Sequence, residues 1–227
     1  GAACDPRVVA GVGGTRVRSQ VRAGVDAYRA HDADSIVGVG GGAALDVAKA
    51  IALMATHEGD LFDYEDEMPG ARPINDTIPY FVALPTTAGT GSEVGRSAVI
   101  SDDETHIKKI IFSPHLLAKV VFADPEMTKD LPAAITAATG MDALTHNIEA
   151  YLAKNYHPIC DGIALEGIRR VMALEAENAR LRAELEQARA AAAQAAVEAE
   201  RRTRRDLVPL RQTLAVFGDQ LAPWNKD

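Results

Sequence analysis

The sequence predicts an α/β fold in which a parallel sheet is followed by a helical region. Two short apolar runs, Ile36–Val39 and Ile78–Leu84, have the length and composition of strands. The first run leads through glycines into residues with helical spacing, which is typical of a strand, a tight turn and a helix. From Leu131 onward, apolar residues recur at helical spacing. We therefore expect an α/β domain over residues 1–130 and helices beyond it.

The composition is that of a soluble globular chain, with 227 residues and a formal net charge of −8. The negative charge argues against a nucleic-acid partner. Cys4 and Cys160 lie far apart and fit no metal-ligand spacing, which is typical of free thiols in a reducing compartment. We find no membrane-spanning run and no signal peptide, so we expect a cytoplasmic protein.

The glycine turn after the first run is the first candidate binding site. Gly40, Gly41 and Gly42 carry no Cβ, so the backbone N–H groups are open to a ligand. The helix that follows directs its N–H groups and positive dipole end to the same point, which suits a pyrophosphate. Gly38-x-Gly40-x-x-Ala43 also fits the dinucleotide fingerprint. On this stretch alone, a plain strand-to-helix turn explains the sequence equally well.

Local patterns predict the neighbouring elements. Ser19 has the character of an N-cap for a helix that ends at Ala30, and the helix after the glycines should end near Ala55. Residues 57–77 form an acidic loop, which we interpret as a solvated surface. Three further short strands are expected before the helical region, the first two as a pair around the polar turn Asp102–Glu104: Ser97–Ser101, Ile107–Phe112 and Val120–Phe122.

A loop rich in hydroxyl groups follows the second strand. It lies at the carboxyl end of that strand, where open α/β sheets bind ligands. Its hydroxyls could hold phosphate, ribose or amide oxygens; alternatively, the loop is simply capped by its own side chains. The hydroxyl residues are Thr86, Thr87, Thr90 and Ser92.

The helical region contains a candidate metal site. Pro132 suits the first turn of a helix that continues to about Lys154. Asp142 and His146 are four residues apart and share one face of this helix. A carboxylate and an imidazole at this spacing can chelate one divalent metal. The alternative is an ordinary surface pair that stabilises the helix slightly.

Three motifs, Gly40–Lys49, Leu84–Glu93 and Thr139–His146, resemble in this order the iron-containing (group III) alcohol dehydrogenases. The resemblance extends from about Ser19 to Arg170. It implies a dinucleotide-binding, Rossmann-like domain and a cleft to a second, all-helical domain that binds metal. Residues 1–130 would form the first domain, and residues 131–170 the start of a truncated helical domain.

The resemblance also implies an activity and a set of site residues. The activity is hydride transfer between NAD or NADP and a small alcohol or aldehyde, with Fe²⁺ or Zn²⁺ as Lewis acid. Asp142 and His146 match the first two metal ligands. The implied cofactor-binding residues are Gly40, Gly41, Gly42, Asp46, Thr86, Thr87, Thr90, Ser92 and Lys109.

The sequence departs from the family at the metal site. The remaining two ligands of the family are histidines further along the helical domain, but the last histidine here is His157, which matches neither. The usual serine after the glycines is Ala43. We therefore expect a site that holds metal weakly, in an impaired enzyme.

After Arg170 the sequence changes character. Residues 171–206 carry a heptad pattern and predict a coiled-coil-like helix, with Asn178 at a position that favours a parallel dimer in register. We expect a homo-oligomer, through residues 172–204; the alternative is a single exposed helix rich in alanine. Residues 207–227 form a tail. The apolar seam consists of Leu174, Leu181, Leu185, Ala188, Ala192, Ala195 and Ala199.

Two features leave other functions open. The heptad segment is also consistent with a non-catalytic oligomerisation protein. The glycine turn is also consistent with a remnant that binds a cofactor without chemistry. Within the tail, Leu210–Leu221 predicts a strand and a turn.

Overall fold

The computed structural model describes residues 5–11 and 16–221, with side chains as far as Thr203. The chain divides into two compact units, Gly1–Ile168 and Arg169–Asp227. Among the described residues, no helix combines the length and the apolar character that a membrane crossing needs. Cys160 is an exposed free thiol, and Cys4 lies outside the described residues.

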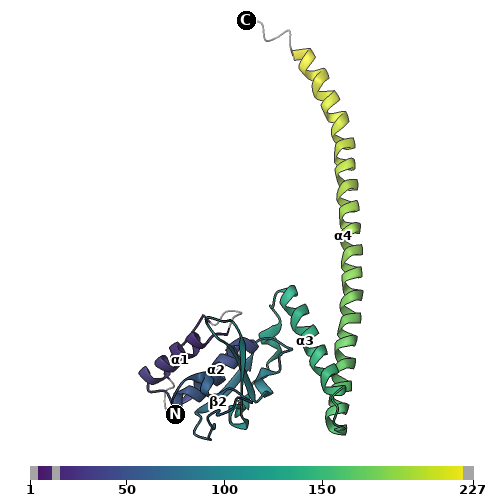
Figure 1. The fold of residues 1–227 in the computed structure, drawn as a ribbon. Coiled ribbons are helices and arrows are strands. Elements are labelled where there is room, and N and C mark those ends of the chain that lie inside the picture. The colour runs from purple at the N-terminus through teal and green to yellow at the C-terminus, as the bar shows by residue number, and fades with distance from the viewer. Residues whose placement is uncertain (1–4, 12–15, 222–227) are drawn as a thin grey trace. The chain divides into compact units, whose positions relative to one another are not determined.

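The first unit alternates strands and helices before it becomes helical (Figure 1). Four short 3₁₀ helices connect the main elements: η1 (Leu61–Tyr64), η2 (Ser92–Val94), η3 (Pro114–Leu116) and η4 (Pro125–Thr128). The main elements are α1 (Arg18–Ala30), β1 (Ser35–Gly40), α2 (Gly42–Thr56), β2 (Tyr80–Pro85), β3 (Ser97–Ser101), β4 (Lys108–Phe112), β5 (Val120–Val121), α3 (Ala133–Tyr151) and the start of α4 (Pro158–Leu221).

The predicted parallel sheet is confirmed, with the strand order β1-β2-β5. In β1 and β2, Gly38 pairs with Ala83 and Gly40 with Pro85. This register places the carboxyl ends of the two strands side by side, so the glycine turn and the hydroxyl loop start from neighbouring points. β3 and β4 form a separate antiparallel hairpin, as the sequence predicts.

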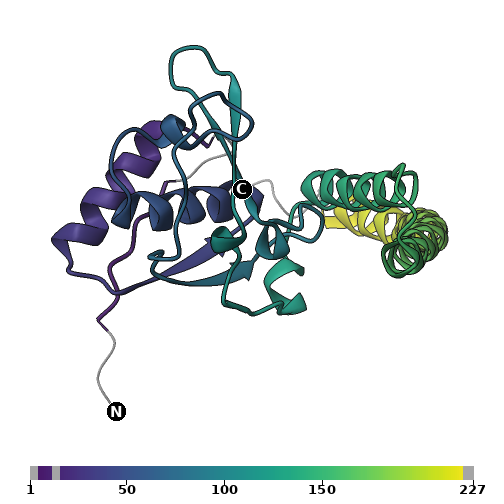
Figure 2. The same ribbon diagram turned by 60° about the horizontal axis from the view of Figure 1, so that its bottom comes forward.

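Helix α2 is the centre of the first unit. It packs against β1 and β2 on one side and against α1 on another (Figures 1 and 2). Leu45 and Leu53 are fully buried on it, because its small and apolar residues leave almost no polar face. Gly24 of α1 lets the two helices approach closely, since a Cβ there would overlap the side chain of Ile51.

The sheet is covered more fully on one face than on the other. Phe81 and Ala83 of β2 are buried, whereas Val37 and Val39 of β1 are 59% and 52% exposed. Side chains alternate between the two faces of a strand, and only one face of β1 packs against α2. The apolar run in β1 therefore does not mean burial on both faces.

Two local expectations were wrong. Helix α1 is capped at Val17, whose N–H donates to the side chain of Gln20 at 3.1 Å. Ser19 lies inside the helix, and its N–H and hydroxyl both donate to the Asp103 carboxylate, at 3.1 and 2.5 Å. The expected strand over Leu210–Leu221 is the last part of α4. Its apolar residues Leu210, Leu214, Phe217 and Leu221 recur every three or four positions, which is the helical period.

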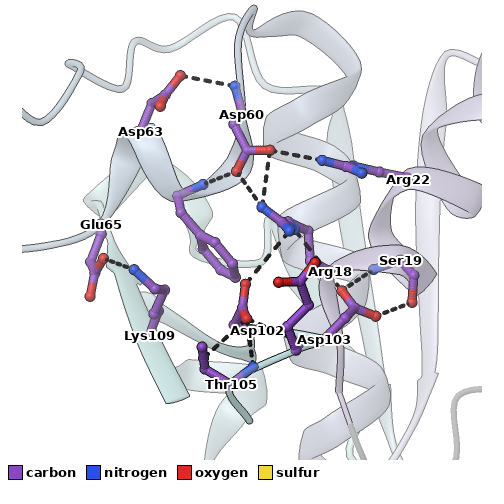
Figure 3. Close-up of polar contacts among 12 residues, drawn as sticks. Arg18, Ser19, Arg22, Asp60, Asp63, Glu65, Asp102, Asp103, Thr105 and Lys109 are labelled. Carbon is purple, nitrogen blue, oxygen red and sulfur yellow. Dashed lines mark hydrogen bonds and ion pairs between the residues drawn. The ribbon is translucent and has the colours of Figure 1, made fainter. Parts of the chain in front are cut away.

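An arginine at the start of α1 joins three segments that are distant in sequence (Figure 3). Arg18 lies 3.3 Å from Asp60, 3.6 Å from Asp102 and 4.0 Å from Asp103. Arg22 adds a second ion pair with Asp60, at 2.9 Å. The cluster connects α1 to the loop before η1 and to the turn of the β3–β4 hairpin.

These contacts change the pKa of Asp60. Burial alone would raise the pKa of this carboxyl, but the Phe62 N–H and the guanidinium groups of Arg22 and Arg18 outweigh burial and lower the pKa below its usual value. The ionised form of Asp60 is therefore more stable in the folded chain than in the unfolded chain. Its contribution to stability is present above the unfolded pKa of about 4 and is lost as the pH falls through the lower folded pKa.

We predict that Asp60→Asn lowers the free energy of unfolding at pH 6 and that its difference from the wild type shrinks below about pH 4. The reason is that the wild type itself loses the charge on Asp60 in that range. Urea denaturation at pH 6 and pH 3 measures both values. Glu126→Gln, which removes an exposed charge paired with Lys129, serves as the control and should change stability little at either pH. If Asp60→Asn changed the free energy of unfolding by the same amount at pH 6 and at pH 3, the lowered pKa of Asp60 would be contradicted.

Candidate functional site

The glycine turn and the hydroxyl loop are in direct contact. The Thr86 N–H donates to the Gly40 carbonyl at 3.0 Å. A Cβ on Gly41 would lie 3.2 Å from the side chain of Thr87, and a Cβ on Gly42 would lie 2.9 Å from that of Thr90. Gly40 has a φ of 147°, which disfavours a side chain. The close approach of the two loops therefore favours glycine at these positions.

This contact leaves polar groups that an anion would satisfy. Among the described residues, no side chain caps the N-terminus of α2, which starts after Gly41. The Thr87 hydroxyl oxygen beside it is buried and has no hydrogen-bond partner. Buried polar atoms are normally paired, so an unpaired one at an uncapped helix N-terminus favours a ligand with anionic oxygens. The pyrophosphate of a dinucleotide fits this chemistry.

The side chains of Asp46 and Ser92 have their hydrogen-bond partners within the protein. Asp46 is 3% exposed and forms an ion pair with Arg16. It also accepts from the Ser92 hydroxyl at 2.7 Å and from the Val99 N–H at 3.3 Å. The structure thus brings these two predicted site residues together, but as partners of each other. They hold the hydroxyl loop against α2.

Lys49 lies beside them and is fully buried. Its ammonium group donates to the Ser92 carbonyl at 2.5 Å, the Ser92 hydroxyl at 3.0 Å and the Ser97 carbonyl at 2.9 Å. Burial lowers the pKa of Lys49, and the charges of Asp46 and Glu93 oppose that shift. Sequence reasoning treated Lys49 only as a motif position. The sequence signal for a buried role was the charged pair of Asp46 and Lys49, three residues apart inside an otherwise apolar helix.

Lys109 is held in a different place from the two loops. Its ammonium group pairs with Glu65 at 2.6 Å and lies 4.9 Å from the centre of the Phe62 ring (Figure 3). These contacts connect β4 to η1. The described structure does not bring Lys109 together with the glycine turn.

The candidate metal ligands lie on α3, next to the hydroxyl loop. His146 Nε2 is 3.6 Å from Asp142 Oδ1. His146 borders an open pocket of about 420 Å³, which Thr90, Glu93 and Asn147 also line. The approach of the loop to α3 is close at Gly89, where a Cβ would overlap the carbonyl of Thr139. The structure therefore places His146 of the predicted metal pair and Thr90 of the predicted cofactor loop on one pocket.

Two family models match the chain. The model described as "Iron-containing alcohol dehydrogenase" matches residues 2–125. The chain belongs to the iron-containing alcohol dehydrogenase family. The model described as "Fe-containing alcohol dehydrogenase family, C-terminal" matches residues 136–200. The similarity thus begins before Ser19 and continues past Arg170, further than the three motifs indicate.

Known members of the iron-containing alcohol dehydrogenases resemble the chain over about two thirds of its length. The 4-hydroxybutyrate dehydrogenase of Cupriavidus necator is 48% identical over 153 residues, which are 67% of this chain and 40% of that protein. The crystal structure of a 1,3-propanediol oxidoreductase matches with a TM-score of 0.64 and 44% identity, over 68% of this chain and 40% of that one. Sulfoacetaldehyde reductase from Bifidobacterium kashiwanohense, solved in complex with NAD⁺, matches with a TM-score of 0.64 and 35% identity over the same shares. The chain spans about two fifths of the length of these relatives.

The residues fit the family's metal only in part. A carboxylate and an imidazole are donors that Fe²⁺ and Zn²⁺ both accept. Within the described residues, however, no group of three or more His, Cys, Asp or Glu side chains could hold a metal ion. Helix α3 also has no buried residue, so solvent reaches Asp142 and His146. Asp142 and His146 are therefore two candidate ligands, and no third His, Cys, Asp or Glu side chain of the described residues joins them.

We predict that Asp46→Ala lowers the free energy of unfolding by about 3–5 kcal/mol, because it leaves the buried Lys49 ammonium without its neighbouring carboxylate. Urea denaturation at pH 7 measures the change. Glu126→Ala is the control, since it removes a carboxylate whose side chain is 73% exposed and which pairs with Lys129 on the surface. It should change the free energy by less than about 1 kcal/mol. Equal effects of the two variants would show that Asp46 does not hold the loop in place.

Proposed function

We propose that the chain forms the cofactor-binding part of a dehydrogenase that transfers a hydride between NAD or NADP and a small alcohol or aldehyde. One observation supports this most directly: the unpartnered Thr87 hydroxyl faces the glycine turn at the uncapped N-terminus of α2. Gly40, Gly41, Gly42 and Thr90 complete this cradle. The NAD⁺ complex of the sulfoacetaldehyde reductase supports the choice of ligand.

In this proposal, Asp46 and Ser92 position the cradle rather than touch the cofactor. Asp142 and His146 would hold a Fe²⁺ or Zn²⁺ ion beside the pocket. A bound metal would supply Lewis-acid polarisation of the substrate oxygen, and a bound nicotinamide would supply or accept the hydride. The small oxygenated compounds in the names of the relatives support a small alcohol or aldehyde as substrate.

We further propose that the chain by itself holds metal weakly. A site with two protein ligands leaves most of the coordination shell to water, which lowers the affinity. The chain alone should then bind the cofactor better than it turns over an alcohol. The exposed free thiol of Cys160 supports a reducing, cytoplasmic setting.

A second role is supported by the second unit. Every residue from Met172 to Thr203 is exposed, including Leu174, Leu181 and Leu185 of the heptad seam. An isolated helix gains little stability without a packing partner. We propose that the chain forms a homo-oligomer through residues 172–204, which is compatible with the enzymatic role.

We predict that Thr87→Val weakens NAD⁺ or NADP⁺ binding about tenfold, because the variant loses a hydroxyl that hydrogen-bonds to the bound cofactor. The folded chain should not lose stability, since Thr87 has no partner in it. Isothermal titration calorimetry measures the affinity, and urea denaturation measures the stability. Thr136→Val, a matched change at an exposed position of α3, should bind as the wild type does. A wild-type chain that binds neither cofactor would overturn the proposal.

We predict that Zn²⁺ or Fe²⁺ binds the wild type weakly and that Asp142→Ala abolishes this binding, because one of two ligands is lost. Anaerobic metal titration followed by calorimetry measures the affinity. Glu126→Ala, which removes an exposed carboxylate outside α3, should leave the binding unchanged. NADH formation from small alcohols should stay near background. Robust alcohol oxidation that disappears in Asp142→Ala would show that the chain does not need further metal ligands.

A further inference from the structure

The charges beside the heptad seam of α4 specify how two copies can pair. We propose that residues 171–199 form a two-stranded, parallel and in-register coiled coil, with both copies of the unit Gly1–Ile168 at the same end. This inference rests on the homo-oligomer proposed above and adds its stoichiometry, direction and register. It is argued from the seam, the flanking charges and Asn178.

The seam provides the apolar contact. Leu174, Leu181 and Leu185 follow one another at spacings of seven and four and are 64%, 48% and 50% exposed. They occupy positions d, d and a of successive heptads, so they lie on one stripe of the helix. A second copy of the same stripe covers them, because each d leucine meets its own counterpart when the copies are in register. The alanines that continue the seam allow the helices to approach closely but add less apolar area.

The residues at positions g and e give the direction. Glu177 and Glu184 occupy g positions, and Arg182 and Arg189 occupy the e positions five residues further on. In a parallel, in-register pair, each g residue faces the following e residue of the other helix. Glu177 then faces Arg182 of the partner subunit, and Glu184 faces Arg189 of the partner subunit. Twofold symmetry repeats both ion pairs, so all four contacts join opposite charges.

An antiparallel pair brings like charges together. In that arrangement, g residues face g residues and e residues face e residues. The carboxylates of Glu177 and Glu184 would oppose each other, and so would the guanidinium groups of Arg182 and Arg189. Such contacts destabilise by amounts similar to those by which opposite charges stabilise. The charge pattern therefore favours the parallel arrangement.

Asn178 supports two strands in register. It occupies an a position between Leu174 and Leu181, in an otherwise apolar seam. Two asparagine side chains can hydrogen-bond to each other only when they meet at the same level of the coiled coil. A shift by one heptad would place each of them against an apolar residue, where it loses that bond. A single polar a position is known to specify register and two strands in this way.

The ion pairs within one helix do not prevent the ion pairs between two helices from forming. Arg180 lies 2.6 Å from Glu177 and 3.7 Å from Glu184. All three side chains are between 48% and 65% exposed, so these pairs are weak and easily replaced. Arg180 occupies position c, away from the seam, and can still neutralise the glutamates from the outside when a second helix is present.

Cysteine cross-linking tests the direction and the register in the full-length chain. In a background with Cys4→Ser and Cys160→Ser, we expect Ala195→Cys, at a d position, to form a dimer disulfide in a glutathione redox buffer. Parallel, in-register helices bring two d positions within disulfide range. Val197→Cys, two residues away on the outside of the helix, should remain a monomer under the same conditions. An Ala195→Cys chain that is dimeric by sedimentation but does not cross-link would overturn the parallel register while leaving the oligomer intact.

Sedimentation equilibrium separates the two levels of the proposal. The wild type should be a dimer at high micromolar concentration, and Arg182→Glu with Arg189→Glu should raise the dissociation constant at least about tenfold, because four attractive contacts become repulsive. Mixing this variant with one that carries Glu177→Arg and Glu184→Arg should restore the dimer. A wild type that is monomeric would overturn both the oligomer and its geometry. Neither result bears on NAD⁺ binding by the first unit, which calorimetry measures separately.

Discussion

The buried pair of Asp46 and Lys49 is the constraint on which the candidate site depends. Two charged groups inside an apolar helix are tolerated only when nearly all of their hydrogen-bonding capacity is used. Here Ser92 supplies its hydroxyl and its carbonyl, Ser97 supplies a carbonyl and Val99 supplies an N–H. If the loop after β2 or the start of β3 moved away from α2, both charged groups would lose these hydrogen bonds.

The contact between the glycine turn and the hydroxyl loop depends on the buried pair of Asp46 and Lys49. Because Ser92 is fixed to α2, the threonines that precede it in the loop are brought against the N-terminus of the same helix. Gly41 and Gly42 allow that approach, since a side chain at either position would press on Thr87 or Thr90. The Thr87 hydroxyl is then buried without a partner. The polar interior of the unit thus holds the hydroxyl loop against the N-terminus of α2.

The parts of this structure that sequence reasoning predicted are those with a local signal. The strand before Gly40, the helix after it and the β3–β4 hairpin follow from apolar period, glycine and turn residues within a short window. The inward direction of Asp46 was not predictable in this way, because its partner Ser92 lies 46 residues further along. The same holds for Lys109, whose carboxylate partner Glu65 is 44 residues distant. The spacing of Asp142 and His146 predicts that they share one helix face, but the position of His146 at a pocket also depends on the approach of Gly89 to Thr139.

The two units obtain their stability from different sources. The first has a core of its own, in which Leu45, Leu53 and Ile111 are excluded from water. The described part of the second is a single helix whose side chains from Met172 to Thr203 are all exposed, so its helical hydrogen bonds are the main interactions that order it. Helices of this kind are marginal in water unless a tertiary or quaternary contact covers their apolar stripe. Pairing of two copies along this stripe would therefore stabilise the second unit directly.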